Sequence, residues 1–201
     1  MEAPIGFATG TKITLIALGP SSTCMSKLDE ARHLSYAQAA PKKDGGKCGW
    51  NIAATMTKAS NTSFRPKQVT GQCPLMLASY IWLKQVDKDA RKYLGSGLKK
   101  VHHAGTYSCR RQRGNNSGAW SEHAFANAWD VTGFELEDGR VISVLKHWHS
   151  DGSKEGRAKA KFLIKSRSSA CRLFRVVLSP DYNAAHKDHF HLDQGPSLSC
   201  R

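Results

Sequence analysis

The sequence lacks the features that mark membrane-spanning, thiolate-zinc and fibrous proteins. Its best candidate for a membrane span, residues 13–18, is far shorter than the roughly 20 apolar residues that cross a bilayer. None of the six cysteines forms a Cys-x-x-Cys pair, which argues against a zinc knuckle or a thioredoxin-type motif. Prolines number only seven, and there are neither internal repeats nor low-complexity runs. The sequence therefore predicts an ordinary globular protein without a membrane span.

Acidic residues are scarce, with 16 Asp and Glu against 30 Lys and Arg, and the formal net charge is +14. A surface of this sign attracts polyanions such as nucleic acid, anionic lipid or the acidic polymers of a cell wall. Nucleic acid is the weakest of these candidates, because the chain has no interleaved aromatic residues and no recognised nucleic-acid motif. A protein that is basic without a polyanionic partner remains the plain alternative.

The six cysteines are even in number and widely spaced. This pattern predicts up to three disulfides and an oxidising compartment, the periplasm or the exterior of the cell. Six buried thiols in a cytosolic protein are the alternative. Spacing leaves the pairing open, although a bridge from Cys24 to Cys48 around the polar loop 41–47 is a natural expectation.

No signal peptide is recognisable, because the first residues contain no basic segment before the apolar stretch. We therefore expect a periplasmic or secreted protein that is either trimmed or exported by a dedicated secretion system. A secretion apparatus and an immunity protein are then candidate partners.

Two helices are expected. The clearer one covers about 74–93, because Pro74 suits a first helical position and Gly95 a C-terminal stop. A second helix is expected over about 155–169, with Ser153 near its start. The residues of this helix expected to face the core are Phe162, Leu163 and Ile164.

Strands are expected over 12–18 and in a hairpin. Residues 131–136 and 141–144 flank an Asp-Gly turn of the kind that hairpins favour. Residues 189–193 alternate with period two and predict a further strand.

With 201 residues, the chain suits one well-buried core more than two domains. We expect a leader or N-terminal extension over 1–23 and one domain over 24–201. The mixture of helices and hairpins predicts an α+β fold, in which helices pack on one side of an antiparallel sheet that carries a zinc cleft.

Two short segments contain most of the candidate metal ligands, namely His123, Asp130, His189 and His191. Two imidazoles and one carboxylate leave a coordination position for water, which distinguishes a catalytic zinc site from a structural one. On a strand, His189 and His191 would point to one face, about 6.6 Å apart. His123 and Asp130 would be about 10.5 Å apart on a helix, too far to share an ion easily. A loop carrying His123 that enters a strand ending near Asp130 is therefore expected.

Each candidate has a structural alternative. Asp130 could cap a turn and Ser121 a helix. The pair His147-x-His149 is expected to lie on the surface or in packing contacts, and the pair His102-His103 on the surface, rather than at a metal.

Several motifs, taken in order, resemble a known family. Ser121-x-His123 followed by Asp130 and later by His189-x-His191 is similar to zinc metallopeptidases of the D-Ala-D-Ala carboxypeptidase and lysostaphin type. Within that group, the bacterial extensin-like C-terminal domain family is the closer resemblance, over about residues 24–195. The further segments that carry it are 106–110, 121–128, 138–144, 177–183 and 188–193. One departure is Ala126, where the family usually has Gly.

The resemblance implies that zinc is held by His123, Asp130 and His191. It implies that His189 exchanges protons beside the metal, with Asp188 as the alternative general base.

The resemblance also implies that Arg110 binds substrate carbonyl or carboxylate groups, a task that suits the forked donors of a guanidinium. Ser121 is expected to contact substrate as well. The alternative for Arg110 is a surface arginine in the basic run 110–113.

The function that follows is a zinc-dependent peptidoglycan peptidase. An endopeptidase that cleaves D-Ala–diaminopimelate or diaminopimelate–diaminopimelate bonds of stem or cross-link peptides is the first expectation. A D,D-carboxypeptidase and a non-catalytic family member that binds the cell wall are the alternatives.

Overall fold

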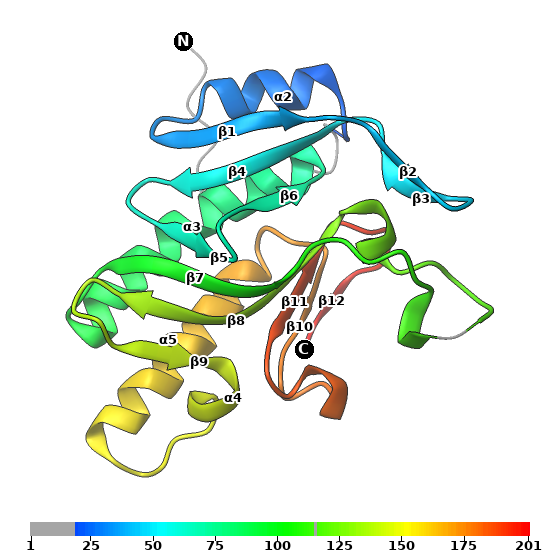
Figure 1. Cartoon of the computed structure of the whole chain (residues 1–201). Helices are drawn as coiled ribbons and strands as arrows, with labels where there is room; N and C mark the ends of the chain where they lie inside the picture. The colour runs from blue at the N-terminus through cyan, green and yellow to red at the C-terminus, as the bar shows by residue number, and fades with distance from the viewer. Residues whose placement is uncertain (1–18, 115) are drawn as a thin grey trace.

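The computed structural model describes residues 19–114 and 116–201 of the chain. The strand expected over 12–18, and most of the leader expected over 1–23, lie outside the described residues. The described part is a mixed α+β structure in which helices pack against largely antiparallel sheets, as the sequence predicts (Figure 1).

The largest sheet runs in the order β12-β10-β11-β8-β7-β5, and β9 pairs with β8. Most neighbours are antiparallel, but β5 pairs with β7, and β12 with β10, in parallel. The strands are β5 (Ser63–Arg65), β7 (Leu98–Gly105), β8 (Ala128–Leu136), β9 (Val141–Ser143), β10 (Val176–Leu178), β11 (Phe190–Asp193) and β12 (Ser199–Cys200).

Two smaller sheets form in the N-terminal half. The first runs in the order β1-β4-β6, and the second is the hairpin β2-β3, which extends to one side of the molecule in Figure 1. Their strands are β1 (Leu34–Ala39), β2 (Lys42–Asp44), β3 (Cys48–Trp50), β4 (Ala53–Ala59) and β6 (Val69–Gly71).

Both expected helices are confirmed, as α3 (Cys73–Leu94) and α5 (Lys154–Ala170). Gly95 ends α3 in the left-handed region with φ of 72°, and the Ser153 hydroxyl accepts the N–H of Gly156 to begin α5. Within the described residues, the remaining helical segments are α2 (Ser22–Asp29), α4 (Val144–His147) and the 3₁₀ turns η1 (Gln112–Gly114), η2 (Glu122–Phe125) and η3 (Ala184–His186).

The core lies between the large sheet and the paired helices α3 and α5. Trp82 of α3 is fully buried and makes edge-to-face contacts with Trp129, Phe134 and Phe174. Such aromatic pairs contribute about 0.5–1.5 kcal/mol each beyond their area burial. This aromatic cluster fixes β8, the strand that carries Asp130, against both helices.

One core expectation on α5 was wrong. Phe162 and Leu163 are buried, but Ile164 is 43% exposed. Consecutive residues on an α-helix point about 100° apart, so three in a row span too wide an arc for one buried face.

The expected hairpin is confirmed, with one correction to its neighbourhood. β8 and β9 pair antiparallel around Asp138 and Gly139, and Gly139 adopts φ of 88°, which suits glycine. However, β8 begins at Ala128, so Asp130 lies near the start of a long strand and not near the end of one. The strand extends further because it pairs with β7 and β11 along its length.

The expectation that His102-His103 lies on the surface was wrong for His103. His103 is buried on β7, donates to the Pro66 carbonyl oxygen at 3.2 Å and contacts the Trp129 ring. Burial lowers its pKa, so it packs as a neutral imidazole. His147 accepts the N–H of Ser143 and His149 is exposed, in agreement with the packing and surface expectation for that pair.

Three disulfides are present, Cys24–Cys73, Cys48–Cys109 and Cys171–Cys200, so the expected Cys24–Cys48 bridge was wrong. Cys24 instead joins α2 to α3, two helices that pack together, a proximity that sequence spacing does not encode. Closing a loop of 49 residues stabilises a fold by about 4 kcal/mol in the chain-entropy account. Three such bridges are consistent with a periplasmic or extracellular protein. Among the described residues, no helix is long and apolar enough to cross a membrane.

Candidate metal centre

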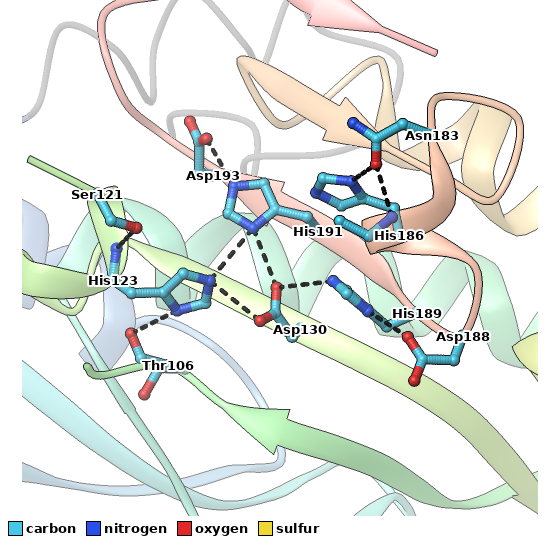
Figure 2. A network of polar contacts seen from close by, with 11 residues as sticks. Thr106, Ser121, His123, Asp130, Asn183, His186, Asp188, His189, His191 and Asp193 are labelled. Carbon is cyan, nitrogen blue, oxygen red and sulfur yellow. Dashed lines mark hydrogen bonds and ion pairs between the residues drawn. The ribbon is translucent and has the colours of Figure 1, made fainter. Parts of the chain in front are cut away.

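His123, Asp130 and His191 converge from three separate elements. His191 on β11 and Asp130 on β8 are direct cross-strand partners in an antiparallel pair, so their side chains share one face of the sheet. His123 comes from η2, the short turn that leads into β8. Figure 2 shows the three side chains meeting from these directions.

The turn after His123 depends on Ala126. This residue adopts φ of 51°, and its N–H bonds back to the carbonyl oxygens of Glu122 and His123. A left-handed conformation costs a non-glycine residue about 1–2 kcal/mol, which explains why glycine is the expected residue here. The alanine methyl group is fully buried, and the turn is nevertheless made.

Gln72, which precedes α3, holds the turn after His123 through two hydrogen bonds. Its side-chain amide donates to the Phe125 carbonyl oxygen at 2.9 Å, and its backbone N–H donates to that of Ala126 at 2.9 Å. The direction in which His123 points is therefore fixed by contacts on both sides of the turn.

The three ligand atoms are spaced as one ion requires. His123 Nε2 lies 3.2 Å from His191 Nδ1 and 3.1 Å from Asp130 Oδ2, and His191 Nδ1 lies 3.0 Å from Asp130 Oδ1. A tetrahedral zinc ion with bonds of about 2.0–2.1 Å separates its ligand atoms by about 3.3 Å. These residues therefore fit a metal ion, and the group could hold one.

The outer nitrogen of each imidazole has its own partner. The Nδ1–H of His123 donates to the Thr106 carbonyl oxygen at 3.2 Å, and the Nε2–H of His191 donates to Asp193 at 2.9 Å. Because these outer N–H groups donate to a carbonyl and a carboxylate oxygen, the inner nitrogens are the ones that could offer a lone pair to a metal ion. Asp193 is itself buried and accepts the N–H of Gly195 at 2.8 Å.

Sequence reasoning did not identify Thr106 or Asp193 as part of the site. Asp193 follows His191 by two positions on a strand, and this period-two spacing is a signal that could have found it. Thr106 contributes only its backbone carbonyl here, a group that every residue has, so its side-chain type carries no such signal.

The electrostatics of the centre favour a cation. Burial raises the pKa of Asp130, but hydrogen bonds and charge from His123 and His191 outweigh it and hold that pKa well below its usual range. Burial lowers the pKa of His191, but the carboxylates of Asp130 and Asp193 outweigh it and raise the pKa to about 9. An ionised carboxylate that stabilises positive charge on its neighbour is a suitable partner for a bound metal.

His189 and Asp188 form a hydrogen-bonded pair beside the three ligands. His189 Nδ1 donates to Asp188 Oδ1 at 2.8 Å, and its Nε2 faces Asp130 Oδ1 at 3.7 Å. His189 therefore lies between Asp130 and Asp188, as Figure 2 shows.

A further histidine, His186, belongs to the same cluster and was not assigned a role from sequence. Its ring lies 5.2 Å from that of His189 and 5.9 Å from that of His191, and its Nδ1 bonds Asn183 Oδ1 at 2.7 Å. Burial, with charge from His189 and His191, lowers its pKa to about 4. The signal in the sequence was the spacing His-x-x-His-x-His over 186–191.

Ser121 and Arg110 lie on the segment that supports η2. The Ser121 hydroxyl accepts the N–H of His123 at 3.3 Å, which is the helix-cap role that was its alternative. The Ser121 N–H donates to the Arg110 carbonyl oxygen at 3.1 Å, and the Arg110 residue is exposed. A substrate contact by either residue stays a prediction.

We expect Asp193→Asn to weaken zinc binding by about 10–100-fold, because a neutral amide no longer holds the His191 Nε2–H as a carboxylate does. Competition with a chromogenic chelator measures the affinity. Asp138→Asn removes the same charge from an exposed turn and should leave the affinity unchanged. Equal affinities of the Asp193→Asn variant and the native protein would contradict the role given to Asp193.

Comparison with known proteins gives one match. A family model described as Extensin-like protein C-terminus matches residues 22–201, which is nearly all of the described chain. No curated protein and no solved structure matches.

Proposed function

This chain belongs to the extensin-like protein C-terminus family, and from that premise we propose that it is a zinc-dependent peptidoglycan peptidase. The observation that carries the proposal is the convergence of His123, Asp130 and His191: the inner nitrogens of both histidines face the Asp130 carboxylate, and their outer nitrogens are bonded to Thr106 and Asp193. The reaction class comes from the resemblance of the chain's motifs to those of zinc metallopeptidases of the D-Ala-D-Ala carboxypeptidase and lysostaphin type.

The residues around the ligand set fit peptide hydrolysis. A zinc ion in such a site acts as a Lewis acid toward a carbonyl and lowers the pKa of water toward about 7. His189 directs Nε2 toward the ligand group and donates its Nδ1–H to Asp188. Its Nε2 lone pair can therefore accept a proton from water and later deliver it to the leaving amine.

The contact between Asp188 and His189 bears on which residue is the base. The bonded Asp188 oxygen faces the His189 ring, so we assign proton transfer to His189 and the orientation of that ring to Asp188. An imidazolium formed on His189 would be stabilised by the same carboxylate. Asp188 as the direct base is the alternative, and the two assignments predict different variants to be inactive.

We place the substrate cleft on the face of the large sheet that presents the ligands, where Asp130 and His191 are partly exposed. The net charge of +14 favours attraction to an anionic wall, and salt would screen it. The disulfides suit the compartment in which peptidoglycan lies. An endopeptidase acting on stem or cross-link peptides is the form we propose, with Arg110 as a candidate contact for substrate carboxylates.

Mass spectrometry of muropeptides after digestion of purified sacculi tests the proposal. We expect the zinc-loaded protein to convert cross-linked dimers to monomers, a chelator to stop the conversion, and added zinc to restore it. Release of free D-Ala without loss of dimers would instead identify a D,D-carboxypeptidase.

Unchanged muropeptides in the presence of stoichiometric zinc would contradict the peptidase proposal. If the protein then still sediments with sacculi, it is a non-catalytic wall-binding member of the family. Measuring zinc in the same sample keeps this result distinct from a preparation that has lost its metal.

A further inference from the structure

A cavity of about 540 Å³ opens beside the β2-β3 hairpin, apart from the metal ligands. Three of its lining residues are lysines and none is acidic. Trp50 of β3 contributes aromatic surface, and Gln72 forms part of the wall. Its lining therefore combines positive charge with apolar carbon, a composition that suits a ligand with carboxylates and a ring.

The acidic residue of the hairpin, Asp44, is already engaged. It accepts the hydroxyl of Tyr107 at 3.0 Å and pairs with Lys42 at 3.6 Å. The Lys42 ammonium also lies 4.3 Å from the Tyr107 ring centroid. Lys43 and Lys47 are exposed, and within the part of the chain that the structure describes neither forms an ion pair. These two ammonium groups are available to an anion.

Trp50 is oriented by its neighbours. Its indole N–H donates to the Ala40 carbonyl oxygen at 3.0 Å, and its ring meets Tyr107 edge-on at 5.2 Å. Trp50 therefore lines the cavity with its indole N–H already bonded and with the Lys42 ammonium 5.9 Å from its ring centroid. An indole ring suits the C–H face of a sugar or an aliphatic side chain.

A disulfide and hydrogen bonds connect the cavity to the candidate metal centre. The Cys48–Cys109 bridge joins the hairpin to the segment whose Ser108 N–H donates to the His123 carbonyl oxygen at 3.0 Å. Gln72 lines the cavity and also bonds the turn that follows His123. A polymer held in the cavity would therefore lie at a fixed distance from the ligand group.

We propose that this cavity is a subsite for the carboxylate-bearing glycopeptide of peptidoglycan, held by Lys43 and Lys47 against Trp50. The identity of the polymer rests on the proposed function, whereas the binding itself requires no turnover. The site positions one flank of the substrate while the scissile bond lies at the metal centre. Nucleic acid fits less well, because the cavity offers one tryptophan ring and not a series of stacking surfaces.

Sedimentation with purified sacculi tests the subsite, using the full chain with His189→Ala so that the polymer stays intact. Adding Lys43→Gln and Lys47→Gln should raise the apparent Kd about tenfold. The matched control adds Lys161→Gln and Lys165→Gln, which remove the same charge from exposed positions on α5 and should change the Kd less than about twofold. Trp50→Ala should weaken binding without changing the charge.

A second arm uses sacculi whose free carboxylates have been amidated. Amidation should weaken binding by the variant with Lys43→Gln and Lys47→Gln much less than binding by the control variant, because the first has already lost the ammonium groups that meet the carboxylates. Equal losses from the two lysine pairs, or full binding to amidated sacculi, would overturn the subsite. The subsite would also be overturned if duplex DNA bound as tightly as sacculi and its binding depended equally on Lys43 and Lys47.

The same variants separate the subsite from the proposed function. If the native protein binds sacculi through these lysines but cleaves no muropeptide, only the proposed function is refuted. If it cleaves muropeptides and its binding to sacculi does not depend on these lysines, only the subsite is refuted.

Discussion

His189→Ala is expected to keep one zinc ion per chain and to slow muropeptide release by about 10²–10⁴-fold, the usual contribution of a positioned general acid–base group. The reason is geometric. His189 lies 3.7 Å from Asp130 Oδ1 but is not one of the three converging ligands, so its loss removes a proton acceptor and leaves the metal site complete. Elemental analysis of the purified variant and initial rates of release measure the two quantities.

Asp188→Asn separates the two assignments of the base. If Asp188 only orients His189, its amide replacement should slow release by less than the loss of His189 does, because the imidazole remains near the ligands. If Asp188 is the direct base, the order reverses. His149→Ala, an exposed histidine outside the cluster, controls for the general effect of removing an imidazole and should retain full rate. Loss of zinc from the His189→Ala variant would show that His189 is a ligand and contradict the role given to it.

Local chemistry predicted the regular elements well. Pro74 and Gly95 mark the ends of α3 to within one residue, and Ser153 caps α5 as expected. Helix-capping residues act on backbone groups only a few positions away, so the ends of a helix can be predicted from the local sequence. The prediction that Ile164 faces the core was wrong because successive side chains point in different directions around a helix. In a continuous apolar run, only those on the inner face are buried.

Long-range partners could not be predicted in the same way. The Cys24–Cys73 pairing depends on α2 packing against α3, and the burial of His103 depends on which face of β7 meets Trp129. Neither relation has a local signature in sequence. Tertiary packing of separate elements therefore decides both.

The family resemblance implied His123, Asp130 and His191 as a set of candidate ligands, and the structure brings these three residues together in a group that could hold a metal ion. The backbone path from His123 to Asp130 differs from the expected one. Asp130 lies near the start of β8 and not near the end of a strand, and the chain passes from His123 to β8 through the left-handed turn at Ala126. The strand register that pairs Asp130 with His191 was not available from spacing. Thr106 remained hidden for the same reason, because its carbonyl meets His123 only in the folded chain.

His123→Ala is expected to abolish stoichiometric zinc binding and to reduce muropeptide release by roughly 10³-fold or more, since both the Lewis acid and the water it activates are lost. The change removes one of three nitrogen or oxygen atoms that lie 3.0–3.2 Å apart, and two protein ligands hold zinc poorly. Elemental analysis and release rates, each at several zinc concentrations, measure the effect.

A buried histidine is also a packing residue, so the control must remove a comparable imidazole elsewhere. His103→Ala does this, because His103 is 8% exposed and His123 4%, and both bond a backbone carbonyl oxygen. Both variants should lose stability in urea unfolding by about 1–3 kcal/mol. Only His123→Ala should lose zinc and activity, because only His123 Nε2 faces Asp130 and His191. Zinc loss of similar size in both variants would mean that the metal reports folding and not this ligand set.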